Sequence, residues 1–271
     1  MAAMIHLTRE VRFSVDRDWA GHIEFTRPVT NSWGGWPSAV GLIPYLCVRA
    51  TVSGAPDPLT GYLCNIKLID DLLRQHTIPY AAQELERRGW RLSAEQLLLA
   101  LWPQVDARIR PPARLERLEL GPTPYLKYAI QHEAPDMVEL TQQFEFSAAH
   151  RLHSPQLSDA ENRAIFGKCN NPNGHGHNYI VEITVAGVPD QRGAVLPLPG
   201  FERLVQQHVI DTLDHTHLNE DVAAFRAINP TVENIARVIW EMLEEHLKPA
   251  RLARVRVFET PKTWAEYRGG R

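Results

Sequence analysis

The chain contains two copies of one sequence pattern, and this repeat restricts its fold more than any single motif. Four segments recur in the same order, at offsets of about 133 to 138 residues. The matched segments are 11–14 with 144–147, 52–63 with 185–196, 92–102 with 230–240, and 114–130 with 251–267. Because chance similarity rarely keeps both order and spacing, we predict a tandem duplication with its boundary near Pro135. The expected domains are residues 1–135 and 136–271.

Each copy has the same predicted order of elements. A strand and a loop-rich stretch come first, and a second strand then leads into a turn rich in Gly, Pro and Asp. Two helices and two closing strands follow. In the last helix of the second copy, Thr231 is a candidate N-cap. The apolar residues after it have helical spacing: Ile235, Val238, Ile239, Met242 and Leu243. This order predicts an α+β fold in which each unit is an antiparallel sheet with two helices on one face.

The second copy carries a group of residues that can bind a metal ion. Residues 166–179 read FGKCNNPNGHGHNY, and His175 and His177 begin a stretch typical of a strand. Residues i and i+2 of a strand point to the same face, so the two imidazoles should aim at one point. His150, at the end of another alternating stretch, offers a third imidazole. Three histidines leave one coordination position open, which is the arrangement of a catalytic Zn²⁺ site.

Cys169 precedes the histidine pair, in a loop rich in Gly, Asn and Pro. Its neighbour Lys168 supplies positive charge, which lowers the pKa of a thiol and raises its thiolate fraction. We therefore interpret Cys169 as a nucleophile or a base. A fourth, structural metal ligand and an inert buried thiol are the two alternatives.

Composition and charge exclude several other classes of protein. A formal charge of −3 argues against nucleic acid as the main partner, because phosphate binding needs a basic surface. No run approaches 18 apolar residues, so we expect no membrane span. The N-terminus lacks the pattern of a secretion signal. Three cysteines cannot form a fully paired framework, which favours the reducing cytoplasm.

Several pieces of the second copy together resemble the 6-pyruvoyl-tetrahydropterin synthase family. They are AAH, FGKCNNPNGHGHNY, LDHTHLN, PTVENIA and VFET, and they span roughly residues 142–269. The combination is specific, whereas HxH alone is a weak signal. The resemblance implies the tunnelling fold, in which the sheets of several units close into a barrel. It also implies 7,8-dihydroneopterin triphosphate as the substrate, with loss of triphosphate and an internal redox shift along the side chain.

The resemblance also implies roles for five further residues. Asp214 and His215 form a carboxylate–imidazole pair, which can fix the histidine's tautomer and help to activate Cys169. Glu259, on a closing strand, corresponds to the glutamate that binds the amino-pyrimidinone edge of the pterin. Thr231 and Glu233 stand where the family places ring contacts, although helix capping explains them equally well. His217 is interpreted as a surface residue. The remaining histidines lie in no motif and are given no role: 6, 22, 76, 132, 153, 208 and 246.

The first copy lacks this chemistry. The positions aligned with His175 and His177 are about Leu42 and Pro44, and neither residue type binds zinc. His150 aligns near Arg17, and Glu259 aligns with Pro122. We therefore expect the first half to be structural, completing a barrel edge or covering surface of the second half. A ligand-binding function of its own is the alternative.

Two features depart from the family pattern. Residues 196–204 read LPLPGFERL where relatives commonly have an Asn- or Asp-containing helix entry, which puts the geometry of 197–200 in doubt. The second departure is the duplication itself. Family sites lie between subunits and receive the Asp-His pair from a neighbour, so a complete site needs the second half of another chain. We expect a homo-oligomer, most simply a trimer of two-domain chains.

Other functions fit parts of this pattern. A 6-carboxy-tetrahydropterin synthase has the same fold and substrate, but the CxxxxxHGH spacing favours the pyruvoyl enzyme. A catalytically retired zinc- or pterin-binding protein is a further alternative, against which the joint presence of Cys169, Asp214, His215 and Glu259 argues. A structural-zinc module is disfavoured, because three histidines without further thiolates make a poor closed site.

Overall fold

The computed structural model describes residues 4–15 and 44–270, and these form two compact units. The first unit contains Met1–Leu140 and Val188–Val195, and the second contains Thr141–Gly187 and Leu196–Arg271. The structure therefore divides the chain at Leu140 rather than near Pro135, and it groups the turn 188–195 with the first unit. The aligned positions Arg17 and Leu42 lie outside the described residues.

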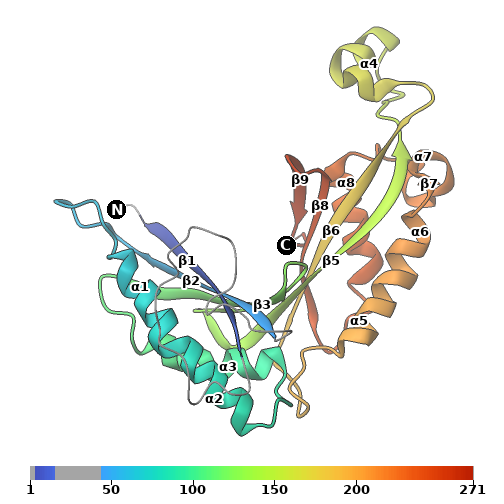
Figure 1. Ribbon diagram of the computed structural model, residues 1–271. Helices are drawn as coiled ribbons and strands as arrows, with labels where there is room; N and C mark the ends of the chain where they lie inside the picture. Colours follow the sequence, from blue (N-terminus) through green and yellow to red (C-terminus); the bar gives the residue numbers. More distant parts are fainter. Residues whose placement is uncertain (1–3, 16–43, 271) are drawn as a thin grey trace. The chain divides into compact units, whose positions relative to one another are not determined.

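In the first unit, an antiparallel sheet carries its helices on one face (Figure 1). The strands pair in the order β1-β2-β3-β4: Ile5–Ser14, Tyr45–Gly54, Arg114–Thr123 and Leu126–Gln131. The helices are α1 (Ile66–Leu72), α2 (Ile78–Arg87) and α3 (Ala94–Asp106), and a π-helical turn, Leu73–Thr77, joins the first two. Alternate strand residues and one stripe of each helix fill the core, for example Phe13, Val48, Leu98 and Leu118.

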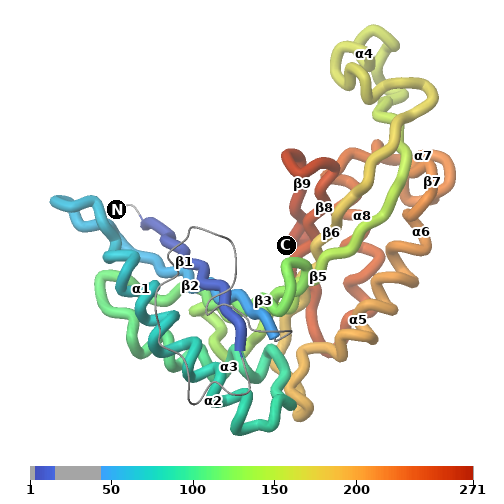
Figure 2. The backbone as a smooth tube through the Cα atoms, viewed as in Figure 1, coloured from blue at the N-terminus to red at the C-terminus, as the bar shows by residue number. Residues whose placement is uncertain are grey.

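The second unit also has a sheet with helices, and Figure 2 traces its backbone from green to red. Its strands pair in the order β5 (Ala134–His150), β6 (His175–Gly187), β8 (Arg251–Thr260) and β9 (Thr263–Tyr267). A short strand, β7 (Thr216–His217), runs parallel to the end of β5. Strand β5 starts in the first unit. The α-helices are α4 (Asp159–Phe166), α5 (Leu198–Val205), α6 (Asp211–Leu213), α7 (Leu218–Asp221) and α8 (Val232–Leu243). The predicted α+β class is confirmed.

Two irregularities recur in the two units at matched positions. The ladder of β2 with β3 shifts register between Thr51 and Val52, and the ladder of β6 with β8 does so between Thr184 and Val185. A π-helical turn occupies Leu73–Thr77 in one unit and Gln206–Ile210 in the other. Bulges and π turns are local departures from regular structure, so their recurrence supports the predicted duplication.

Helix α8 forms where its apolar stripe and cap predict. Thr231 has extended backbone, and its side chain accepts a hydrogen bond from the Asn234 amide. The stripe residues Ile235, Val238, Ile239 and Leu243 are buried, whereas Met242 is half-buried.

The unusual entry at residues 196–200 still starts a helix. Pro197 stands at the N-cap without a side-chain cap hydrogen bond, whereas Asn65 caps α1 by accepting from the Lys67 amide. Phe201, only 1% exposed, packs edge-on against Phe144 with ring centroids 5.9 Å apart. Burial of this aromatic ring contributes to holding the helix on the sheet.

Candidate active site

Three histidines meet where two paired strands of the second unit come together. His150 is the last residue of β5, and His175 and His177 are the first and third residues of β6. The period of two along β6 places both of its imidazoles on one face. The three ring centroids lie 4.5 to 5.2 Å from one another.

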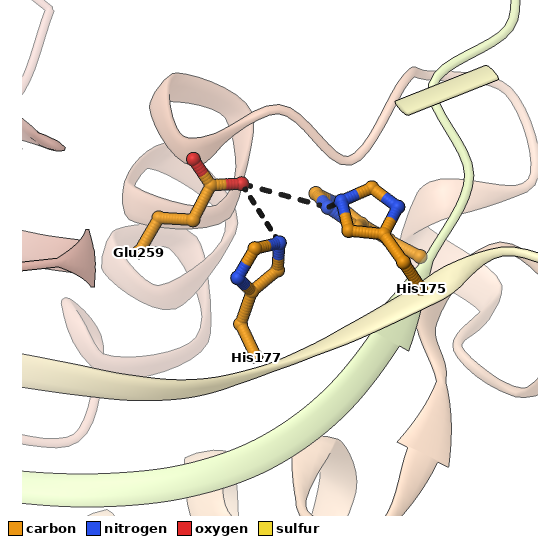
Figure 3. A group of neighbouring side chains, drawn as sticks. His175, His177 and Glu259 are labelled. Carbon is orange, nitrogen blue, oxygen red and sulfur yellow. Dashed lines mark hydrogen bonds and ion pairs between the residues drawn. The ribbon is translucent and has the colours of Figure 1, made fainter. Parts of the chain in front are cut away.

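Glu259 reaches the same group from β8 (Figure 3). Its Oε1 lies 3.5 Å from His150 Nε2 and 3.4 Å from His177 Nε2. One ligand atom from each of the four residues falls within 4.8 Å of the others. Glu259 was expected to bind the substrate, and the structure adds contact with the histidines. The antiparallel pair Ile180–Phe258, which sets the register of β6 on β8, brings it there.

The surroundings of His150 fix its tautomer. Nδ1 lies 2.8 Å from the Pro230 carbonyl oxygen, which can only accept, so Nδ1 carries the proton and Nε2 keeps its lone pair. The side chain is fully buried, and this burial lowers the pKa of His150 to about 4. Burial also lowers the pKa of His175. Neutral imidazoles are the form that binds metal ions.

The donor set fits a divalent cation. His150 Nε2 and His175 Nε2 are 3.1 Å apart, and His177 Nε2 is buried without a hydrogen-bond partner. Two imidazole nitrogens bound at about 2.0–2.1 Å to one tetrahedral Zn²⁺ lie about 3.3 Å apart. A bound cation would therefore satisfy nitrogen atoms that otherwise face one another inside the protein.

Gly174 positions the histidine pair, because it ends the turn that leads into β6. Its φ is +70°, and a Cβ there would lie 2.7 Å from His217 Nε2 and 3.0 Å from the His150 carbonyl oxygen. We expect Gly174→Ala to destabilise the fold by about 1–2 kcal/mol and to weaken metal binding about ten- to a hundredfold. Metal titration of the purified variant measures this.

Gly176→Ala is the matched control for Gly174→Ala. It lies between the same two histidines, but a Cβ there meets nothing nearer than the Ala148 carbonyl oxygen at 3.7 Å. Its metal affinity should equal that of the wild type. Equal affinities for both variants would contradict the positioning role of Gly174.

Cys169 lies in the 3₁₀ turn Gly167–Asn170 that follows α4. Its carbonyl accepts a hydrogen bond from the Leu152 amide at 2.9 Å, which ties the turn to the chain leaving β5. The free thiol is half-buried. Among the described residues, the group of converging ligand atoms does not include it, which favours a chemical role over metal ligation.

Asn162, on α4, holds the loop that precedes this helix. Its side chain is fully buried, accepts from the Ser154 amide at 2.8 Å, and donates to the carbonyls of Ser154, Leu157 and Ser158 at 2.9–3.1 Å. We expect Asn162→Ala to lower the free energy of unfolding by about 1–3 kcal/mol, because it removes a fully buried amide and the four hydrogen bonds that this amide makes with the backbone. Urea unfolding measures this, with exposed Asn173→Ala as the control. A change within about 0.5 kcal/mol, as for a surface substitution, would contradict the assignment.

Asp214 and His215 form the predicted pair. Asp214 Oδ2 lies 2.7 Å from His215 Nδ1, and Asp214 Oδ1 accepts from the Ser147 amide at 2.8 Å. That backbone hydrogen bond, together with the one to His215, lowers the pKa of Asp214. The His215 side chain is 82% exposed and its φ is +57°. It lines an open hollow of about 440 Å³ together with His177 and Ala148.

The interpretation of His217 as a surface residue is wrong, because its side chain is held inside the sheet edge. It is half-buried in β7, pairs with Ala149 of β5, and its Nδ1 is buried without a hydrogen-bond partner. It lines the same hollow as His177 and His215. Its place follows from a two-residue strand, which is too short to leave a periodic signal in the sequence.

Thr231 and Glu233 begin α8. Thr231 acts as the N-cap, and Glu233 is an exposed acidic residue in the first turn, where it favours the positive end of the helix dipole. In the described part of the chain, neither belongs to the metal-ligating group. Capping accounts for Thr231 and the helix dipole for Glu233, and their predicted ring contacts stay a prediction.

Comparison with known proteins identifies the family of the second half. The model of the 6-pyruvoyl tetrahydropterin synthase family matches residues 139–270. A 6-pyruvoyl tetrahydrobiopterin synthase of Drosophila melanogaster is 50% identical over 132 residues, which are 48% of this chain and 79% of that protein. The human protein of that name is 42% identical over 132 residues, 48% of this chain and 91% of its own length. The chain belongs to this family.

Among solved structures, 6-pyruvoyl tetrahydropterin synthase of Caenorhabditis elegans is 41% identical to the chain. The alignment covers 49% of this chain and 96% of that one, with a TM-score of 0.47. Separately, none of the helices in the described ranges is long and apolar enough to cross a membrane.

Proposed function

We propose that the second half of this chain is a zinc-dependent 6-pyruvoyl-tetrahydropterin synthase. It converts 7,8-dihydroneopterin triphosphate to 6-pyruvoyl-tetrahydropterin and eliminates triphosphate. The convergence of His150, His175 and His177 in a half that matches this family carries the proposal. Cytoplasmic location is part of it, because the three cysteines are free.

The proposed metal ligands are the Nε2 atoms of His150, His175 and His177. Three imidazoles without a thiolate leave a position open for substrate, and imidazole suits Zn²⁺ among other metals. Bound Zn²⁺ would stabilise the negative charge that develops on the substrate's side-chain oxygens. The Pro230 carbonyl holds the His150 ring in the tautomer that such binding needs.

Cys169 acts as the base in this proposal. Its thiolate removes a proton from the substrate's side chain next to the polarised oxygens. Asp214 holds the proton of His215 on Nδ1, so His215 Nε2 is free to exchange a proton with the thiol or with water. Glu259 accepts hydrogen bonds from the N–H groups of the pterin edge. Because Glu259 also contacts His177, a pterin bound to it would lie beside the metal ligands.

A homo-oligomer completes the site in this proposal. His215 is 82% exposed in the single chain, so the Asp214–His215 pair is accessible to a neighbouring chain. The simplest assembly is a trimer of two-unit chains. A strictly monomeric protein by light scattering, still fully active, would contradict this part.

Metal removal tests the proposed function. Treatment with a chelator should abolish triphosphate release from 7,8-dihydroneopterin triphosphate, and added Zn²⁺ should restore it. Release that persists at the same rate in metal-free protein would contradict the proposal.

The runner-up is a 6-carboxy-tetrahydropterin synthase acting on the same substrate. The five residues between Cys169 and His175 favour the pyruvoyl product. A retired binding protein stays the alternative if no turnover is seen with metal bound.

A further inference from the structure

The first unit contains a cavity that the proposed chemistry does not use. Its volume is about 580 Å³, within the range of about 300–1,000 Å³ typical of small-molecule sites. It lies between α1 with the π-helical turn after it and the segment 108–113 that leads into β3. The side chains of Val52, Leu63, Ile69 and Leu72 supply an apolar wall.

One side of this cavity is polar. Gln75, His76 and Arg108 line it and also line an adjoining hollow of about 210 Å³. The other residues of that hollow include Thr77, Tyr80 and Gln104. The larger, apolar cavity therefore shares a wall of hydrogen-bond donors with the smaller, polar hollow.

Two exposed arginines, Arg108 and Arg110, line the cavity. Arg108 Nη1 donates to the Gln104 carbonyl at 2.8 Å, and Arg110 donates to the carbonyls of Ala107 and Ile109. Within residues 4–15 and 44–270, no carboxylate forms an ion pair with either guanidinium. Asp71 also lines the cavity, so the two arginines leave a net positive charge there. An anionic group would satisfy these donors with charge-assisted hydrogen bonds.

The second unit places a pair of rings at the matched positions. Gln75 corresponds to His208, because the π-helical turns Leu73–Thr77 and Gln206–Ile210 align. Ile109 corresponds to His246 when the alignment of the closing strands is extended toward the N-terminus. His208 stacks on His246 with ring centroids 3.9 Å apart. The first unit has no ring at either position, and there Gln75 and Ile109 line open space.

We propose that the first unit binds an amphipathic organic anion, a ligand with an apolar body and one carboxylate- or sulfonate-like group. The body lies against Leu63, Ile69 and Leu72, and the anionic group lies at the wall of Gln75, His76 and Arg108. This gives the first half a binding function of its own, independent of the synthase reaction.

Fluorescence titration of the full, zinc-loaded chain with 8-anilinonaphthalene-1-sulfonate tests the proposal. We expect one probe bound per chain. The uncharged analogue N-phenyl-1-naphthylamine should bind about tenfold more weakly, because it lacks the charge-assisted contact. Arg108→Gln should weaken binding of the sulfonate about tenfold and leave the analogue unchanged. Arg88→Gln, at the C-cap of α2 and outside both cavities, is the matched control.

Cys64 provides a second measurement at the cavity itself. It lines the cavity with a half-buried free thiol, so bound sulfonate should slow its alkylation by N-ethylmaleimide, while Cys169 serves as the internal control. Cys64→Trp should block binding of both probes, with the fold checked by zinc content and circular dichroism.

Three outcomes would overturn the proposal. Unchanged alkylation of Cys64 at saturating sulfonate would place the probe elsewhere, as would unchanged binding to folded Cys64→Trp. Equal affinity for the sulfonate and its neutral analogue would contradict the preference for an anionic ligand. If neither probe bound, the proposal that the cavity is a binding site would be wrong.

Discussion

Cys169→Ala is expected to lower kcat by about 10²–10⁴-fold, the usual contribution of a positioned base, while zinc content stays at one ion per chain. In the proposed function the thiol takes a proton from the substrate, and it lies outside the group of atoms that converge on the metal position. Steady-state turnover and metal analysis of the same preparation measure the two quantities together.

The metal content decides between the two roles of Cys169. Loss of zinc together with activity would make the thiol a ligand and would contradict the base assignment. Cys64→Ala is the matched control, since it removes a half-buried thiol from the first unit. Its turnover and zinc content should equal those of the wild type.

His177→Ala is expected to lower zinc affinity by at least about a hundredfold. Even the substitution of a residue that only supports a metal ligand lowers metal affinity by about 10–100-fold. His177 Nε2 is a buried nitrogen without a hydrogen-bond partner, 3.4 Å from Glu259. Its side chain is 20% exposed, so the truncation leaves a smaller cavity than loss of fully buried His150 would. Competition with a chromophoric chelator measures the affinity.

His132→Ala is the control for the loss of an imidazole. His132 is exposed in the turn between β4 and β5 of the first unit. Its zinc affinity should match that of the wild type. If His177→Ala also bound zinc with wild-type affinity, the three-histidine site would be wrong.

The period-two rule predicted the core of the site. His175 and His177 share a face of β6 because they are two residues apart on one strand. His150 was proposed as the third ligand because it ends another alternating stretch, and the structure places the end of β5 beside the start of β6. Helix α8 was readable from its cap at Thr231 and its apolar stripe, because both are local signals.

The remaining features depend on pairing between segments distant in sequence. The contact of Glu259 with His150 and His177 follows from the register of β8 on β6. The half-buried position of His217 follows from a two-residue parallel pairing with β5. The first unit's cavity depends on how the segment 108–113 packs near Ile69. No local sequence pattern encodes such packing.

The most direct test of the proposed function is product analysis by mass spectrometry, after the zinc-loaded full chain has acted on 7,8-dihydroneopterin triphosphate. We expect triphosphate together with a tetrahydropterin that keeps a three-carbon diketo side chain. Acetaldehyde with a 6-carboxy product would contradict the pyruvoyl assignment and identify the runner-up. An unchanged substrate, with zinc bound and the oligomer intact, would contradict the assignment of an enzyme.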